Sequence, residues 1–287
     1  MEICPFQWIP DEFECHQQLE IPNIEESQMS QPDHPLHRTI STWDEFQHAW
    51  NGLTNFLLAG DCVPFAFDMP AIEDVIEEIR RDPDARILPG TKGDSLNLTD
   101  IAETFRAIPV RDTLGMQFQM SHFKLPNFYA PGQLFHGFEE QVMEPWQGAL
   151  ASAGFTWTRC YPIIFISGPE SATNYHMDRS HVLAWQRHGT KRFVGLKDPA
   201  RWAPLDQRVL PGGEMARPED LADEDALPYE MHPGDVLWNC ILTPHWVEAA
   251  DHVTYSINIS HGGLRLDRKL APFEQELEDW QAEHSGG

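Results

Sequence analysis

The sequence predicts a mainly β protein with flanking helices, whose core is an antiparallel barrel or a two-sheet roll. After Gly154 the chain divides into short apolar or alternating segments that are separated by Gly, Pro and Asp turns, a pattern typical of short antiparallel strands. The 23 prolines exceed average usage and favour turns over long helices. Helical periodicity is confined to a few stretches outside the strand-rich region.

The first half of the chain combines an irregular segment with short helices. Residues 1–40 lack periodicity and are expected to be strap-like. Thr42 begins a capping-box pattern, Thr-Trp-Asp-Glu, and the apolar residues after it keep helical spacing, so we expect a helix over about 42–58. Residues 82–136 give no clear elements. The other expected elements are a strand over 63–67, a short acidic helix over 72–81, and a helix within 138–151 that starts or kinks at Pro145.

The second half supplies the strands of the predicted barrel. An acidic, polar insert over 200–228 interrupts them, and we expect it to be a surface loop over the mouth of the barrel. An acidic amphipathic helix is expected over 272–283. The expected strands cover 158–166, 181–186, 192–196, 236–239, 246–249 and 253–259.

The length of 287 residues fits one large domain with a substantial extension. We expect residues 1–150 to form a helical or irregular N-terminal extension packed on the core. Residues 151–265 form the β core, with the insert at 200–228, and residues 266–287 form a C-terminal helix and tail. No internal repeat is evident.

Charge is the extreme feature of the composition. Asp and Glu total 45 against 20 Lys and Arg, which gives a formal net charge of -25. Nucleic-acid binding draws on Lys and Arg that neutralise phosphates, so a nucleic-acid partner is not expected. A cationic peptide or small cationic substrate would be attracted instead, while the simplest interpretation of the charge is solubility.

Cysteine usage and hydropathy favour a soluble, cytoplasmic protein. The five cysteines are scattered and form no CxxC pair, which argues against a disulfide framework and against a zinc–cysteine site. No basic region precedes an apolar run at the N-terminus, so no signal peptide is expected. The longest apolar stretches are too short to span a bilayer, so no membrane partner is expected.

The sharpest local signal for chemistry is the triplet His176-Met177-Asp178. On an extended segment, residues two apart point to the same side, so an imidazole and a carboxylate can face one ion. His245 lies at the start of a later strand. Two histidines and one carboxylate on one face of a metal leave positions open for co-substrate and oxygen, as in non-haem Fe(II) oxygenases. The alternative is an ordinary turn pair, because a chain with 14 histidines contains such triplets by chance.

Further motifs surround this triplet in a fixed order. They are Thr173, the segment Gln186 to Lys191, the segment His232 to Trp238, and the segment Pro244 to Glu248. Together with the triplet they resemble the JmjC (jumonji, cupin-like) family of Fe(II)- and 2-oxoglutarate-dependent oxygenases, in particular its small hydroxylases. The resemblance covers about residues 158–262. The order of the motifs is specific, whereas each motif singly is not.

The resemblance implies a double-stranded β-helix (jelly-roll or cupin) core that uses Fe(II), 2-oxoglutarate as co-substrate, and O2. It implies that His176, Asp178 and His245 are the iron ligands. It also implies roles in co-substrate binding. Thr173 and Lys191 match residues that bind the distal carboxylate of 2-oxoglutarate, and Asn258 matches an amide near its iron-proximal end, although its spacing from His245 differs from the family's.

Physical chemistry independently favours a cation in such a barrel. A dicarboxylate that chelates a metal through one end leaves a second carboxylate buried, which is costly unless a cation pairs with it. Lys191 is placed to do this, although a surface lysine at a strand edge is the ordinary alternative. An arginine about ten residues after His245 would serve in other oxygenases, but Arg265 lies 20 positions on.

The expected function is that of a 2-oxoglutarate-dependent dioxygenase that hydroxylates an unactivated C–H bond, most simply of an amino-acid residue in a peptide or protein. A free amino acid or a natural-product intermediate is an alternative substrate. Two other classes stay open: a non-catalytic cupin-like binding or regulatory protein, and a cupin metal enzyme without 2-oxoglutarate, which would usually show an HxH pair. A homodimer through the C-terminal helix is open too, beside a solvated helix.

Overall fold

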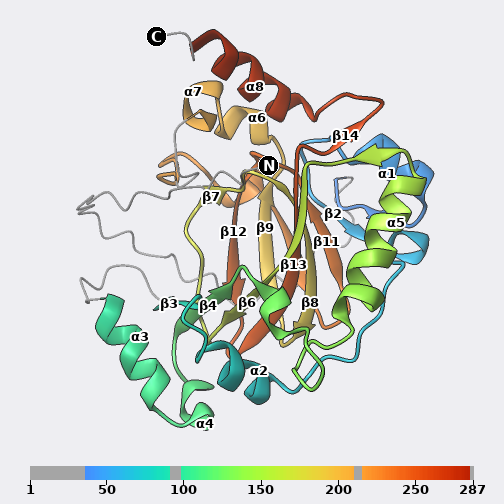
Figure 1. Cartoon of the computed structure of the whole chain (residues 1–287). Coiled ribbons are helices and arrows are strands. Elements are labelled where there is room, and N and C mark those ends of the chain that lie inside the picture. The colour runs from blue at the N-terminus through green and yellow to red at the C-terminus, as the bar shows by residue number, and fades with distance from the viewer. Residues whose placement is uncertain (1–35, 91–97, 210–214, 285–287) are drawn as a thin grey trace. The chain divides into compact units, whose positions relative to one another are not determined.

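Two sheets form the centre of the structure, a computed structural model that describes residues 36–90, 98–209 and 215–284 (Figure 1). These residues lie within one unit, Pro32–Gly287. The major sheet has the order β1 (Thr39–Ile40), β2 (Phe56–Leu58), β11 (Val236–Asn239), β8 (His181–His188), β13 (Thr254–Gly262), β6 (Arg159–Ser167), β4 (Phe118–His122) and β3 (Arg86–Pro89). The minor sheet has the order β10 (Ala226–Met231), β9 (Lys191–Leu196), β12 (Pro244–Ala249) and β7 (His176–Met177).

The order of these strands is that of a jelly roll. From β6 to β13 the chain passes between the sheets, with β6, β8, β11 and β13 in the major sheet and β7, β9, β10 and β12 in the minor sheet. Neighbouring strands within this set are antiparallel. The expected mainly β fold with flanking helices and a double-stranded β-helix core is therefore confirmed.

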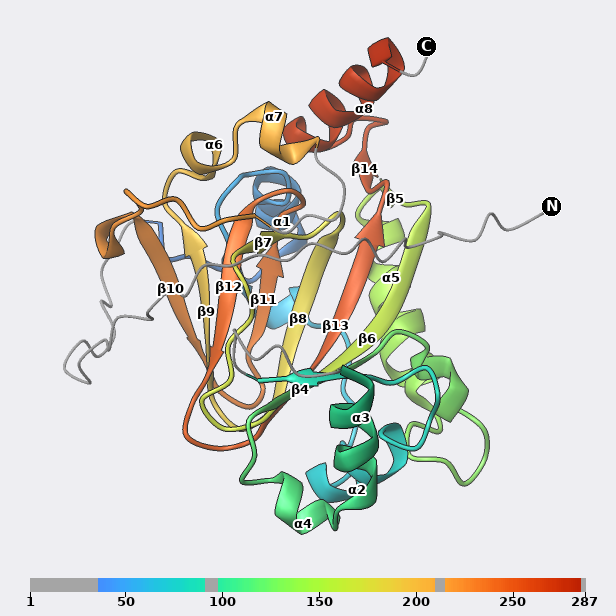
Figure 2. The ribbon, with the colours of Figure 1, turned by 90° about the vertical axis from the view of Figure 1, so that its left-hand side faces the viewer.

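Helices flank the sheets in three groups. Helices α1 and α5 lie along one side, α2, α3 and α4 lie at one end of the strands, and α6, α7 and α8 lie at the other end (Figures 1 and 2). None of the described helices is long and apolar enough to cross a membrane. Their bounds are α1 Trp43–Ala49, α2 Ile72–Ile79, α3 Leu98–Ala107, α4 Val110–Thr113, α5 Glu144–Ser152, α6 Pro199–Trp202, α7 Leu205–Arg208 and α8 Pro272–His284.

Four single turns and one strand pair complete the described elements. The turns are Gly60–Cys62, Leu125–Phe128 and Asp223–Asp225, which are 3-10 helical, and Glu139–Met143, which is π-helical. Strand β5 (Phe155–Thr156) pairs with β14 (Arg265–Leu266).

The largest apolar core lies on the outer face of the major sheet. Phe46 of α1 and Trp146 of α5 pack with Trp238 of β11, with ring centroids 5.0 and 6.3 Å from that indole. All three side chains are fully buried. A smaller apolar group, which includes Phe193 of β9 and Leu237 of β11, lies between the sheets. This apolar core thus holds the major sheet from its outer face, and the inner face of the sheet is free to carry the candidate site.

The helix expected over 42–58 is wrong in its length. The capping box at Thr42 forms, with Glu45 closing it, but α1 ends at Ala49. Residues 56–58 instead form β2, which pairs with β11. The strand expected over 63–67 is also wrong: this segment has no ladder partner among the described residues, and it packs through side chains such as Phe65, whose ring lies 4.9 Å from that of Trp185.

The other two helices that the sequence predicts in the first half are present. The acidic helix expected over 72–81 is α2, which buries four apolar residues along one face. Within 138–151, a π-helical turn precedes α5, whose first turn contains Pro145, so the proline marks the start of the α-helix. The irregular segment expected over 1–40 lies outside the described residues up to position 35.

All six strands expected in the second half are present, as is the helix expected over 272–283. The insert expected over 200–228 is partly wrong, because its last three residues belong to β10, which pairs with β9. Trp202 and Leu221 of the insert are buried with Val194 and Trp246 on the outer face of the minor sheet. Pro211 to Gly213 lie outside the described residues.

Candidate metal centre

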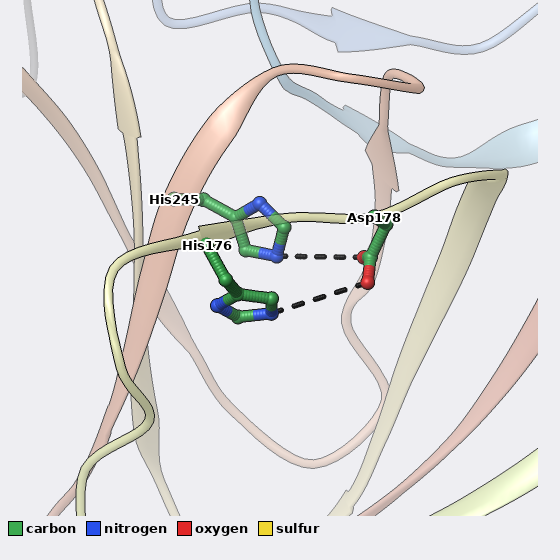
Figure 3. A group of neighbouring side chains, drawn as sticks. All are labelled: His176, Asp178 and His245. Atoms are coloured by element: carbon green, nitrogen blue, oxygen red, sulfur yellow. Dashed lines mark ion pairs between the residues drawn. The ribbon is translucent and has the colours of Figure 1, made fainter. Parts of the chain in front are cut away.

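Pairing between β7 and β12 brings the two candidate histidines side by side. His176 lies directly opposite His245 in the antiparallel register, and Asp178 follows β7. Figure 3 shows the carboxylate of Asp178 facing both rings. Its oxygens lie 3.9 Å from His176 Nε2 and 3.4 Å from His245 Nε2. One potential ligand atom from each residue lies within 4.8 Å of the others, which is compact enough to surround one ion.

Hydrogen bonds orient both imidazole rings. The Nδ1–H of His176 donates to the Asn174 carbonyl at 2.7 Å, and that of His245 donates to the Thr243 carbonyl at 3.0 Å. A carbonyl only accepts, so the proton of each neutral ring belongs on Nδ1. Each Nε2 therefore presents its lone pair towards Asp178, the arrangement in which a neutral histidine binds a metal.

The environment of His245 keeps its ring neutral. It is buried, and its ring stacks on Phe193 with centroids 4.9 Å apart and an interplanar angle of 11°. Burial, and then the neighbouring His176, lower the pKa of His245 to about 4, against an opposing effect of Asp178. The His176 and Asp178 side chains are 26% and 33% exposed, so one side of the group is open to solvent.

A residue that the sequence analysis missed holds the carboxylate. Asn239, at the end of β11, is fully buried and its Nδ2 donates to Asp178 Oδ2 at 3.2 Å. The backbone N–H of Leu242 donates to the Asp178 carbonyl at 2.9 Å. The available signal was an amide in an otherwise apolar strand, Val236–Asn239, six positions before His245.

Lys191, the first residue of β9, is buried between the sheets. It is 7% exposed, and its Nζ donates to Ser256 Oγ of β13 at 2.7 Å. Burial lowers the pKa of Lys191 to about 7. No carboxylate of the described residues forms an ion pair with Lys191. A buried cation without a counter-ion is an unusual arrangement that suits an anionic ligand.

Strand register relates Lys191 to the histidines. Lys191 lies opposite Ala249 of β12, four residues beyond His245, and alternate residues of a strand share a face. Lys191 and His245 therefore face the same interior, separated by roughly 13 Å along the strand. Thr173 lies between these two levels, where its hydroxyl accepts the Val247 N–H at 2.9 Å.

Asn258 lies on the opposite wall of the interior. It is two residues beyond Ser256 on β13, so the two side chains share the face from which Ser256 contacts Lys191. Asn258 Oδ1 is buried and has no hydrogen-bond partner among the described residues. The structure thus places all six predicted site residues on the strands, or directly beside the strands, that enclose this interior.

Comparison with solved structures finds the same architecture in an oxygenase. The ribosomal oxygenase YcfD of Escherichia coli matches with a TM-score of 0.50 and 15% identity, covering 88% of this chain and 59% of that one. The chain shares the YcfD fold. A second YcfD structure matches at TM-score 0.49 with 18% identity, over 88% of this chain and 60% of YcfD. A complex of YcfD with cobalt and 2-oxoglutarate matches at TM-score 0.48 with 18% identity, over 86% and 58%.

The YcfD comparisons extend over only part of the larger protein. The chain spans about 60% of the length of the YcfD structures that it matches. No family model matches the chain, and no curated protein matches it by sequence. The expected likeness to an oxygenase is therefore confirmed at the level of the fold.

Proposed function

We propose that this chain is an Fe(II)- and 2-oxoglutarate-dependent dioxygenase of the JmjC, cupin-like type. The observation that carries the proposal is the group of His176, Asp178 and His245, whose ligand atoms lie within 4.8 Å of one another. Two neutral imidazoles and one carboxylate are the donor set of non-haem Fe(II) oxygenases. When bound, the iron and 2-oxoglutarate supply the oxidation of an unactivated C–H bond by O2.

The interior between the sheets fits a dicarboxylate as well as a metal. Lys191 supplies a buried positive charge that no described carboxylate neutralises, about four residues along the strand from the histidines. A short dicarboxylate in that interval would have one end at the histidines and the other near the ammonium group of Lys191. Thr173 lies between the two levels with a hydroxyl proton left to donate, because its oxygen accepts the Val247 N–H.

The amide of Asn258 supports the iron-proximal end of the same ligand in this proposal. On β13 it lies midway between Ser256 and Ser260. Ser256 contacts Lys191, whereas Ser260 and Asn239 lie at the same level on the two sides of β8. Asn239 contacts Asp178 at the metal end. Asn258 is therefore level with the middle of the interval, where its unpaired oxygen and its amide protons can contact a ligand.

We propose hydroxylation of an amino-acid residue in a peptide or protein, in the cytoplasm. The partly exposed His176 and Asp178 leave the metal side of the group open to a substrate held outside the barrel. The net charge of -25 favours a basic substrate and disfavours nucleic acid. YcfD is a ribosomal oxygenase by name, and a protein substrate would agree with that. A free amino acid or natural-product intermediate is the alternative small substrate.

Two observations weigh against the other classes. A non-catalytic barrel has no need of a metal-ligand set with both rings oriented, or of an unneutralised buried lysine. A cupin enzyme that works without 2-oxoglutarate needs no buried cation either. A homodimer through α8 stays an open proposal that the oligomeric state in solution would test.

The deciding experiment is an anaerobic titration of the metal-free protein with Fe(II) and then 2-oxoglutarate. We expect the weak visible charge-transfer band of the chelate, its loss in His176→Ala and Lys191→Ala, and its retention in Lys197→Ala, a surface lysine beyond β9. Iron binding without the band would leave a metal-dependent cupin without 2-oxoglutarate. Absence of iron binding would refute the enzyme proposal.

A further inference from the structure

The orientation of Asp178 depends on a chain of two buried amides. Asn239 Nδ2 donates to Asp178 Oδ2 at 3.2 Å, and the same carboxylate oxygen lies 3.4 Å from His245 Nε2. Asn55 Nδ2 in turn donates to Asn239 Oδ1 at 2.6 Å. Asn55 and Asn239 are 1% and 0% exposed, so water does not compete for these bonds.

The direction of each amide follows from its neighbours. A carboxylate only accepts, so Asn239 must present its NH2 group to Asp178 and its oxygen to the other side. Thr243 Oγ1 lies 3.4 Å from that oxygen but donates its proton to the Cys240 carbonyl at 2.6 Å, so Asn55 is the donor that pairs with Asn239 Oδ1. Asn55 must therefore donate, which fixes the direction of its own amide as well.

Asn55 is itself held on two sides. Its backbone carbonyl accepts the Tyr229 hydroxyl at 2.7 Å, which ties it to β10. Its amide lies against Gly195 of β9, where an added Cβ would come within 1.9 Å of Asn55 Oδ1. Gly195 has no positive φ, so space for Asn55 is the reason for glycine at this position.

We infer that Asn55 and Asn239 are positioning residues for the Asp178 ligand, and that Gly195 provides the space they require. The inference rests on the proposed metal-binding role of Asp178. Asp178 is one-third exposed and would otherwise rotate freely in water, so a buried donor to one oxygen selects the rotamer that faces the two histidines. Asn55 lies 184 positions before Asn239, so the segment before β2 takes part in the geometry of the metal site.

The test measures Co(II) and Fe(II) binding by the metal-free protein under anaerobic conditions. Asn239→Leu removes the donor with little change of volume, and we expect about a 10- to 100-fold rise in the metal dissociation constant. The visible spectrum of the Co(II)-saturated variant should shift as well, because the carboxylate reorients. Asn127→Leu, at an exposed amide that contacts Asp82, is the control and should change neither quantity.

A double-mutant cycle separates positioning from folding. Gly195→Ala should displace Asn55 and weaken metal binding about as much as Asn55→Ala does. The double variant Asn55→Ala/Gly195→Ala should bind metal no more weakly than Asn55→Ala alone, because the displaced group is gone. Thermal unfolding of each metal-free variant identifies any that simply fails to fold.

The outcomes are distinct. If the wild-type protein binds metal and Asn239→Leu binds it equally tightly with an unchanged Co(II) spectrum, the positioning role is refuted and the proposed function survives. If Gly195→Ala weakens binding equally in both backgrounds, Gly195 does not act through Asn55. If the wild-type protein binds no metal, both the proposed function and this inference fail.

Discussion

Lys191 reaches from the minor sheet to the major sheet and donates a 2.7 Å hydrogen bond to Ser256. The contact places an ammonium group in the interior of the jelly roll without a carboxylate partner among the described residues. Burial makes the neutral amine more favourable than it would be in water, which is why the pKa of Lys191 falls to about 7. Its charge is therefore available for a ligand and is held at a cost in stability.

We expect the affinity of the metal-loaded protein for 2-oxoglutarate to fall as pH rises above about 7. The anion binds the protonated lysine, so each pH unit above the pKa of the free protein should reduce the affinity by up to about tenfold. Calorimetry in buffers of different ionisation enthalpy should detect proton uptake on binding. In Lys191→Arg the side chain stays charged, so any remaining binding should lose this dependence. A flat profile in the wild-type protein would contradict the prediction.

We expect Lys191→Met to separate stability from binding. The variant should lose 2-oxoglutarate binding and still bind metal. At pH 6 the wild-type lysine is mostly protonated and buried without a carboxylate partner among the described residues, so its replacement should stabilise the metal-free protein by about 1–4 kcal/mol. Urea unfolding at pH 6 measures this difference. A loss of stability would mean that the ammonium group has a favourable partner in the metal-free fold.

Two buried histidines on the outer face of the major sheet predict that the folded state is less stable in acid. Burial is the main cause that lowers the pKa of His181 to about 3 and that of His261 to about 4. The unfolded chain binds these protons near pH 6.5, whereas the folded chain does not, so stability should be lost as pH falls below about 6.5. Each histidine contributes at most about 1.4 kcal/mol per pH unit. Urea unfolding between pH 7 and 5 should show a shallower slope in His261→Gln.

We expect Trp146→Phe to destabilise the fold without changing metal affinity. The indole Nε1–H donates to His261 Nε2 at 2.7 Å, and both residues are fully buried. Phenylalanine keeps most of the apolar contact but leaves the histidine acceptor unpaired, which costs about 1–3 kcal/mol. Chemical unfolding gives the stability change, and Co(II) titration of the same variant serves as the control. A marked change in Co(II) affinity would show that this outer core is coupled to the site.

The strands and the closeness of His176 to Asp178 were readable in the sequence because both depend on local pattern, whereas His245 was assigned as a ligand through the family resemblance. Alternation and turn residues mark β6, β8 and β9, and two-residue spacing puts His176 and Asp178 on one side. The position of Lys191 followed from motif order. Its burial and its contact with Ser256 could not be read from sequence, because that contact joins two sheets.

The errors at the helix expected over 42–58, at the insert and at Asn239 share one physical cause, which is pairing with residues that are distant in the sequence. Helical spacing continues through Leu53 and Leu57, yet α1 stops at Ala49 because residues 56–58 gain a ladder with β11. The first three residues of β10 were assigned to the acidic insert, since the pairing of β10 with β9 leaves no local signal. Asn239 was missed for the same reason: its donor Asn55 is remote in sequence.

The pairing of β2 with β11 bears on how this protein can be shortened. A fragment that begins at residue 151 would lack β2 and α1, and with them Phe46, Trp50 and Asn55. It would expose the open edge of β11 and the aromatic outer face of the major sheet, two features that promote association between chains. Truncation for crystallography or screening should therefore keep the chain from β1 onward, even though the candidate metal ligands all lie beyond residue 175.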